Sequence, residues 1–386
     1  MTEATNIETE KANEAVVLYR ELETQFDSKI GIATLNSAKS LNALSLDMVK
    51  SLLPQLIKWQ QDSAIAMVVL EGVGEKAFCA GGDIRDLYAA MIKNPGQAAP
   101  YVEDFFTNEY QLDYLIHTYD KPFLVWGTGI VMGGGLGLMA GASHRIVTES
   151  SRIAMPEITI GLYPDVGGTY FLNQMPKGCG LFLGLTGASI NAADAKHINL
   201  ADFFVAQDKK QALYDELLTT KWGQTTSLNH QKLNDLIRKF ESEALNLMPQ
   251  GNVQLHSDLI DEVTQKDSVD GVIDAILSIG GDDKWVSRAQ KSLSHGSAIT
   301  AHIVYNQLIL GKDMSLAECF RFELGVSVRC AQSGEFAEGI RALLIEKDYQ
   351  PKWRFANVHD VDPEMISSMF VSPWSDETHP LKGLGR

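Results

Sequence analysis

Two acidic residues lie in an otherwise apolar and glycine-rich stretch, Ala154 to Gly168, and their surroundings suit them to chemistry. Glu157 and Asp165 have no basic neighbour within this stretch. Burial raises the pKa of a carboxyl group, and two nearby acids push their pKa values apart. Glu157 and Asp165 could therefore act as a base and an acid near neutral pH. Taken singly, Glu157 could equally cap a backbone turn, and Asp165 could be an ordinary turn residue after Pro164.

Two glycine-rich segments upstream each follow an apolar run and open a helical pattern. The first contains Gly81 and Gly82, with a helix expected to begin near Asp83; the second runs from Met132 to Ala140. The first amide N–H groups of a helix have no partner inside it, so such a corner can bind an anion. If both helices start from the same sheet edge, two N–H groups aimed at one oxygen form an oxyanion hole.

The second glycine segment also imitates a dinucleotide-binding fingerprint, with Gly135, Gly137 and Ala140 at the required spacing after an apolar run. The helix that follows has room only from Gly134 to Ala142 before the next expected strand. That length is too short for the usual strand–helix–strand crossover. We therefore expect an N–H site rather than a dinucleotide site.

The elements that must position these residues alternate between strand and helix patterns. Residues 15–23 and 30–36 predict a hairpin, and Ser45 is the expected N-cap of a helix that reaches Asp62. Further strands are expected at 66–70, 123–130, 145–148 and 201–206, and helices at 101–118, 181–186 and 192–196. Beyond residue 206 the pattern is helical, at 211–219, 228–247, 269–277, 298–310 and 316–331.

Length and composition set the broad class. The 386 residues predict one large α/β core with an appendage, and the net charge of −16 argues against nucleic acid or an anionic membrane as a partner. The four cysteines form no CxxC pair, and no His or Cys spacing is typical of a metal site. We therefore expect a reduced, soluble, cytoplasmic protein without a metal. Cys79 is interpreted as a small core residue, because no histidine lies near it in the sequence.

Three ordered motifs, FCAGGDI, MGGGLGL and AMPEITIGLYPDVGGTYFL, resemble the crotonase, or enoyl-CoA hydratase/isomerase, superfamily. The likeness covers roughly Val16 to Trp353, includes NSAKSLNAL and FFTNEY, and is greatest to the 3-hydroxyisobutyryl-CoA hydrolase branch. The resemblance implies an α/β spiral of repeated strand-strand-helix units followed by a helical C-terminal region. The acidic, polar composition of residues 1–14 predicts a disordered tail, and the element pattern limits the catalytic core to 15–206. The resemblance implies that the helices of 207–386 fold back on this core.

The same resemblance implies roles for particular residues. Gly82 and Gly134 would supply the two oxyanion N–H groups, and Glu157 and Asp165 would be the reactive carboxylates. The resemblance adds substrate contacts, namely Glu109 and, for the anionic tail of CoA, Lys39. Taken without the resemblance, Glu109 is expected to be solvated, and Lys39 could equally be a solvated loop lysine.

Two departures from the family pattern bear on the reaction. Hydratases of the superfamily carry a second glutamate where this chain has Gly137, and a glycine where it has Asp165. Addition of water to a double bond needs both hydratase acids on one water, so Gly137 argues against hydration. Dienoyl-CoA isomerases resemble the chain at Glu157 and Asp165 but add an acid at the position of Gly137.

The expected function is hydrolysis of a short β-hydroxyacyl-CoA thioester, with 3-hydroxyisobutyryl-CoA and valine catabolism implied by the resemblance. Isomerisation or hydration of an enoyl- or dienoyl-CoA is the alternative, and a non-catalytic CoA-binding protein is a further one. No cofactor is expected, because CoA is part of the substrate. The sequence leaves open whether the chain assembles with further copies of itself.

Overall fold

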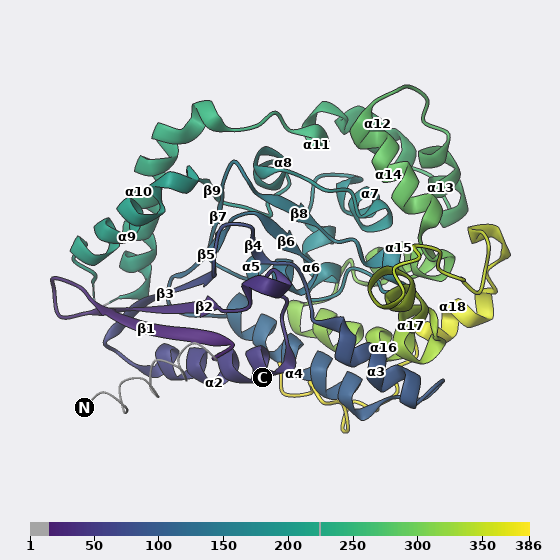
Figure 1. Ribbon diagram of the computed structural model, residues 1–386, viewed down its shortest axis with the longest axis horizontal. Coiled ribbons are helices and arrows are strands. Elements are labelled where there is room, and N and C mark those ends of the chain that lie inside the picture. The colour runs from purple at the N-terminus through teal and green to yellow at the C-terminus, as the bar shows by residue number, and fades with distance from the viewer. Residues whose placement is uncertain (1–14, 224) are drawn as a thin grey trace.

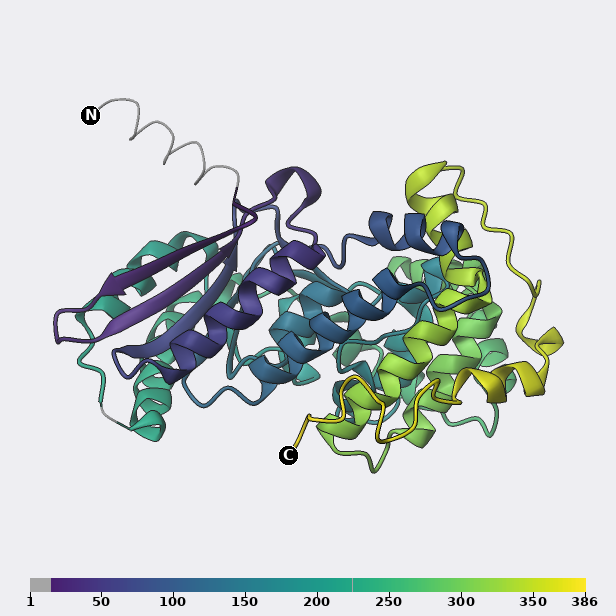
Figure 2. The same cartoon turned by 90° about the horizontal axis from the view of Figure 1, so that it is seen from below.

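The computed structural model describes residues 15–223 and 225–386, so the predicted disordered tail at 1–14 lies outside the described residues. The described chain builds two sheets, one of six strands and one of three. Helices surround both sheets, and the helices after residue 206 gather mainly at the end away from the opening hairpin (Figures 1 and 2). Among the described residues, no helix combines the length and the apolar character that crossing a membrane requires.

The six-stranded sheet has the order β1-β2-β3-β5-β7-β9. Strands β1 and β2 form the predicted antiparallel hairpin, and every later neighbour pairs in parallel. The strands are β1 (Val17–Glu23), β2 (Lys29–Leu35), β3 (Ile65–Gly72), β5 (Phe123–Gly127), β7 (His144–Val147) and β9 (Phe203–Phe204).

Both faces of this sheet are covered by helices, as the almost wholly apolar run of β3 requires. Successive residues of a strand point to opposite faces, so Met67 and Val69 pack with Trp126 in the layer beneath α9 (Lys210–Thr219) and α10 (Thr226–Ala244). Val68 and Leu70 point the other way, into the larger core that includes α2 (Leu46–Gln61).

The three-stranded sheet consists of β4 (Ala77–Cys79), β6 (Ile130–Met132) and β8 (Arg152–Ala154), in that order. The pairs β3/β4, β5/β6 and β7/β8 each give one strand to each sheet, which confirms the predicted spiral of strand-strand-helix units. The single strand predicted at 123–130 is therefore wrong: the chain changes sheets after β5. Gly129 allows this change, since its φ is +62° and a Cβ there would lie 2.2 Å from the carbonyl oxygen of Lys76.

Helices α2 and α3 begin where the sequence predicts. Ser45 caps α2 by accepting a hydrogen bond from the amide of Met48, and Asp83 caps α3 through the amide of Arg85. The other helices in this half are α3 (Ile84–Lys93), α4 (Pro100–His117), α5 (Gly134–Ala140), α6 (Gly168–Asn173), α7 (Cys179–Thr186) and α8 (Ala192–His197).

The second half is helical, and part of it packs back against the first half (Figure 1). Helix α16 packs against α4 and α6, and α17 packs against α3 and the 3₁₀ turn Glu157–Ile160. Besides α9 and α10, the helices are α11 (Asn252–Leu255), α12 (Ser257–Thr264), α13 (Val269–Leu277), α14 (Lys284–His295), α15 (Ala298–Leu310), α16 (Leu316–Ser333), α17 (Glu335–Ile340) and α18 (Pro363–Met369).

Candidate active site

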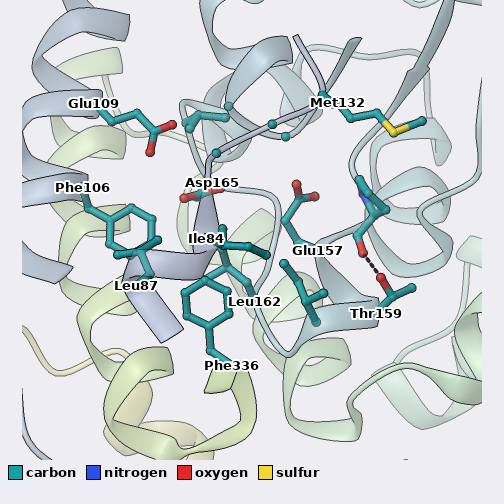
Figure 3. Close-up of a pocket in the computed structure, with 18 of the residues that line it drawn as sticks. Ile84, Leu87, Phe106, Glu109, Met132, Glu157, Thr159, Leu162, Asp165 and Phe336 are labelled. Carbon is teal, nitrogen blue, oxygen red and sulfur yellow. Dashed lines mark hydrogen bonds between the residues drawn. The ribbon is translucent and has the colours of Figure 1, made fainter. Parts of the chain in front are cut away.

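One cavity of about 270 Å³ brings together five of the six residues that the sequence singles out. Its lining includes Gly82, Glu109, Gly134, Glu157 and Asp165, and most of the remaining wall is apolar (Figure 3). The three carboxyl groups come from separate segments of the chain and lie around the same space.

Lys39 is the sixth predicted residue, and the structure does not place it in this cavity. It is exposed on the 3₁₀ turn Ala38–Ser40 and is absent from the cavity lining. Its predicted contact with CoA would therefore have to involve a part of the ligand that lies outside the cavity.

The small sheet places the two glycine corners side by side. Strands β4 and β6 are parallel neighbours, so the chain leaves both at the same edge, and the glycines follow directly. A Cβ on Gly134 would lie 3.5 Å from the amide nitrogen of Gly82, which shows how closely the corners approach. Among the hydrogen bonds of the described residues, neither the Gly82 nor the Gly134 amide is a donor. Both N–H groups are free to bind an oxygen.

Glu157 begins the 3₁₀ turn that follows β8, and its side chain is only 5 % exposed. Its Oε2 has no hydrogen-bond partner among the described residues. The other oxygen fits because Gly133 lacks a side chain: a Cβ there would lie 2.9 Å from Glu157 Oε1. Burial, together with the nearby charge of Asp165, raises the pKa of Glu157 well above its usual range.

Asp165 lies in the loop between this turn and α6, and a tyrosine fixes its orientation. Tyr110 of α4 donates a 2.6 Å hydrogen bond to Asp165 Oδ2, and the Tyr110 hydroxyl also lies 2.7 Å from Ser327 Oγ of α16. Burial raises the pKa of Asp165 to about 7, although the bond from Tyr110 opposes the rise. An acid with this pKa can change protonation state near neutral pH.

Glu109 is buried, which corrects the expectation, made without the family resemblance, that it is solvated. It lies on the inner face of α4 and is 2 % exposed. Burial, and then the charges of Asp165 and Glu157, raise the pKa of Glu109 well above its usual range. A Cβ on Gly134 would lie 2.4 Å from Glu109 Oε1, so the glycine makes room for this carboxyl group.

Two further buried acids next to the site were not predicted. Asp113, one turn after Glu109 on α4, has no hydrogen-bond partner for either oxygen among the described residues. Glu323 of α16 accepts hydrogen bonds of 2.8 and 2.7 Å from the amides of Gly167 and Thr169, and burial raises its pKa to about 8. Both acids occupy apolar faces of helical patterns, and an acid at a core position of an amphipathic helix is the signal that could have identified them.

The cavity therefore brings two unpartnered N–H groups and three buried carboxyl groups to the same space. Free N–H groups can stabilise an oxygen that becomes negative, and carboxyl groups of raised pKa can exchange protons with water or substrate. Within residues 15–223 and 225–386, no three metal-ligating side chains are grouped so that they could hold a metal ion.

A family model described as Enoyl-CoA hydratase/isomerase matches residues 30–370. The chain belongs to the enoyl-CoA hydratase/isomerase family. It is 36% identical over 346 residues to the mitochondrial 3-hydroxyisobutyryl-CoA hydrolase of Danio rerio, which covers 89% of this chain and 87% of the relative. The human protein of the same name is 34% identical over 348 residues, covering 90% and 87% of the two chains.

Solved structures of this family share the architecture. An enoyl-CoA hydratase from Rhodobacter sphaeroides 2.4.1 aligns with a TM-score of 0.78 at 29% identity, over 93% of this chain and 98% of the other. A carnitinyl-CoA dehydratase from Mycobacterium thermoresistibile aligns equally well at 30% identity, over 93% and 97% of the two chains.

The relatives correct one prediction made from the sequence. The proteins from Danio rerio and human are both named as mitochondrial, which contradicts the cytoplasmic location inferred from unpaired cysteines. A reducing compartment is all that the cysteine pattern indicates, and cysteine usage does not separate one such compartment from another.

Gly137, where hydratases of the family carry a second glutamate according to the resemblance, has no space for a side chain in this structure. A Cβ there would lie 2.6 Å from Val166 Cβ and 3.1 Å from Asp113 Oδ2. Val166 follows Asp165 directly and has a φ of +51°. The loop that carries Asp165 thus occupies the volume that a side chain at residue 137 would need.

Proposed function

We propose that this chain hydrolyses a short β-hydroxyacyl-CoA thioester and that 3-hydroxyisobutyryl-CoA is the leading candidate. One observation carries the proposal: Glu157 and Asp165 are buried in the cavity that the unpartnered Gly82 and Gly134 amides also line. The choice of the 3-hydroxyisobutyryl group comes from the names of relatives that match about nine-tenths of the chain.

The two glycine amides are the proposed oxyanion hole. In the reaction the thioester carbonyl carbon becomes tetrahedral and its oxygen becomes negative. The N–H groups of Gly82 and Gly134 would donate to that oxygen, and loss of one such donor typically costs about 3–4 kcal/mol of transition-state stabilisation. The close approach of the two corners supports this role, because one oxygen can then accept from both amides.

Glu157 is the proposed base or nucleophile. It either removes a proton from the attacking water or attacks the carbonyl carbon and forms an anhydride that water then opens. In both routes water supplies the new carboxyl oxygen, the carbon–sulfur bond breaks, and the thiolate of CoA takes up a proton. Its unpartnered Oε2 supports either route, because no protein group competes for that oxygen.

Asp165 is the proposed partner of Glu157, and Glu109 is a proposed substrate contact. Tyr110 donates a hydrogen bond to Asp165 Oδ2, so the other oxygen of Asp165 can orient the water or the β-hydroxyl group of the substrate. Glu109 lies against the Gly134 corner, where the acyl group would enter. No cofactor has a part in this proposal, since CoA arrives as part of the substrate.

Hydration or isomerisation of an enoyl-CoA is the second candidate, because two solved structures with the same architecture are an enoyl-CoA hydratase and a carnitinyl-CoA dehydratase. The packing at Gly137 favours hydrolysis, since Val166 fills the volume that a second hydratase glutamate would need. With that acid missing, α5 carries no carboxyl group at the position where the resemblance places the second hydratase acid, which argues against addition of water to a double bond.

The product formed from a panel of acyl-CoA substrates tests the proposal. Release of free CoA thiol from 3-hydroxyisobutyryl-CoA is the expected result, and the Glu157→Gln variant should abolish it. A change in enoyl or dienoyl absorbance without thiol release would refute hydrolysis and establish the second candidate. Binding of acyl-CoA with neither product would instead show a non-catalytic CoA-binding protein.

A further inference from the structure

Helix α4 carries three titratable side chains in a row, Glu109, Asp113 and His117. Their four-residue spacing places them on one face of the helix, about one turn apart. Glu109 lines the cavity, Asp113 is fully buried, and His117 is partly exposed at the last residue of the helix. The row therefore runs from the cavity to a partly exposed end of α4.

Helix α5 packs against α4 and faces this row with glycines. A Cβ on Gly137 would lie 3.1 Å from Asp113 Oδ2, and one on Gly141, the C-cap of α5, would lie 2.7 Å from His117 Cδ2. Gly134 approaches the first carboxyl group of the row in the same way. At these three positions α5 places no side chain between the groups of the row.

Asp113 is buried without any hydrogen bond. It is 0% exposed, and neither oxygen has a partner among the described residues. Burial, followed by the charges of Glu109 on the same helix, Asp165 in the loop before α6 and Glu323 on α16, raises its pKa well above the usual range. An ionised carboxylate at this depth would lose its water at a cost of several kcal/mol. Asp113 therefore holds a proton at neutral pH.

His117 ends the row with a ring nitrogen that points into the protein. Its Nε2 is buried and has no hydrogen-bond partner within the described part of the chain, and a Cβ on Gly167 would lie 3.5 Å from it. The ring packs edge-on against Tyr170 and Phe320. Burial, and then the charge of Arg145, lowers the pKa of His117 to about 4, so the ring is neutral near pH 7. Such a ring can accept a proton and pass one on without keeping it.

We propose that Glu109, Asp113 and His117 form a path along which the proton of the hydrolysis product leaves the cavity. The proposal rests on the proposed function and extends it. Hydrolysis turns the thioester and water into a thiol and a carboxylic acid. A carboxylic acid of ordinary pKa becomes a carboxylate near neutral pH, so one proton must leave in each turnover. While CoA is still bound, the row offers that proton a second way out.

Each step of the path moves one proton and leaves the row with its starting charge. Ionised Glu109 takes the proton from the product, because burial makes it a stronger base than an ordinary carboxylate. Asp113 accepts this proton on one oxygen and gives up its own to His117 Nε2. His117 is then briefly a cation and releases a proton to solvent. Groups that do not touch exchange protons by side-chain rotation or through a bridging water.

Two substitutions that preserve shape test the path. Asp113→Asn removes the carrier, and His117→Phe keeps the aromatic packing but removes both ring nitrogens. Each should lower kcat for thiol release from 3-hydroxyisobutyryl-CoA by about tenfold or more and leave KM unchanged. The solvent isotope effect on kcat should increase, because proton exit then limits turnover. The matched control is His144→Phe, which replaces another buried histidine with an unpartnered Nε2, on β7, and should change neither quantity.

Two further measurements separate a relay from a structural role. Imidazole should restore kcat in His117→Ala and leave the wild type unchanged, because it replaces the missing ring. The infrared difference between the wild type and Asp113→Asn at neutral pH should contain the carbonyl stretch of a protonated carboxyl group, and this readout needs no turnover.

The outcomes distinguish the path from the proposed function. Unchanged kcat and isotope effect in the folded variants, no rescue by imidazole, or no infrared band from a protonated Asp113 would each overturn the inference. Thiol release by the wild type would still support hydrolysis in all three cases. If the wild type releases thiol from no acyl-CoA, the proposed function fails, and the row has no product proton to carry.

Discussion

Replacement of Asp165 by asparagine should make the protein less active and, at alkaline pH, more stable. The amide has the shape of the carboxyl group and can still accept the hydrogen bond from Tyr110. It cannot become negative or act as a base. Under the proposed mechanism, thiol release should fall about 100-fold or more, the usual scale for a positioned acid or base.

The change in stability follows from the pKa of Asp165 in the folded protein. Burial raises this pKa from 3.8 to about 7, so between these values the folded state holds a proton that the unfolded state has lost. The corresponding stabilisation is complete below pH 3.8 and is lost as the pH rises through 7. A rise of about three units corresponds to about 4 kcal/mol, which is the most that the wild type should lose, relative to Asp165→Asn, by pH 9.

Urea unfolding between pH 5 and pH 9 measures the free energy of unfolding of both proteins. Other buried acids, such as Glu323, titrate in both, so the decisive quantity is the difference between the two curves. That difference should grow in favour of the asparagine variant up to about pH 7 and stay constant above it. Asp235→Asn, which changes an exposed acid on α10, is the matched control and should give a curve parallel to the wild type.

Parallel curves for Asp165→Asn and the wild type would refute the assignment of a raised pKa to Asp165. Full activity per folded molecule, with folding checked by circular dichroism, would refute its part in the reaction. Lost stability with intact activity would instead make Asp165 a turn residue after Pro164. Wild-type activity should also rise as the pH passes through about 7, because the ionised form of Asp165 is the working one.

Three further substitutions test other parts of the site. Gly134→Val should abolish turnover without unfolding the chain, since a side chain there meets Glu109 and covers the amide. Thiol release near the wild-type rate would show that Gly134 is not part of the oxyanion hole. Glu157→Gln should be at least as damaging as Asp165→Asn, and the double variant should be little worse, because residues that act together are not additive; additive losses would show independent roles. Lys39→Glu should raise the KM for acyl-CoA more than for acyl-pantetheine, and equal effects would remove its contact with CoA.

Local pattern was sufficient to predict most elements of the fold. The predicted helices at 269–277 and 298–310 coincide with α13 and α15. The prediction failed at 123–130, because it joined Phe123 to Trp126 with Ile130, although Gly129 between them lies where the chain passes from one sheet to the other. It also missed α14, a largely polar segment in which only Val286, Ala289 and Leu293 are buried.

The residues of the site that lie within short glycine-rich or acidic motifs were predicted, whereas contacts between distant segments were missed. Glu157 and Asp165 are visible because no cation lies near them in the sequence. Tyr110 and Ser327 are separated by 217 residues, and only the packing of α16 against α4 brings their hydroxyl groups together. A single sequence carries no signal for such a contact, which depends on how helices pack.

The helices after residue 206 complete the site rather than merely extending the core. Helix α16 supplies Glu323, which accepts hydrogen bonds from two amides at the start of α6. It also supplies Ser327, whose hydroxyl group hydrogen-bonds with that of Tyr110, the tyrosine that donates to Asp165. Two of the groups that fix the Asp165 loop therefore come from the C-terminal half of the chain. Loss of α16 would expose Asp165 to water and lower its pKa toward the ordinary value, because desolvation is the main cause of the rise. The reactivity proposed for this acid thus depends on a helix more than 150 residues further along the chain.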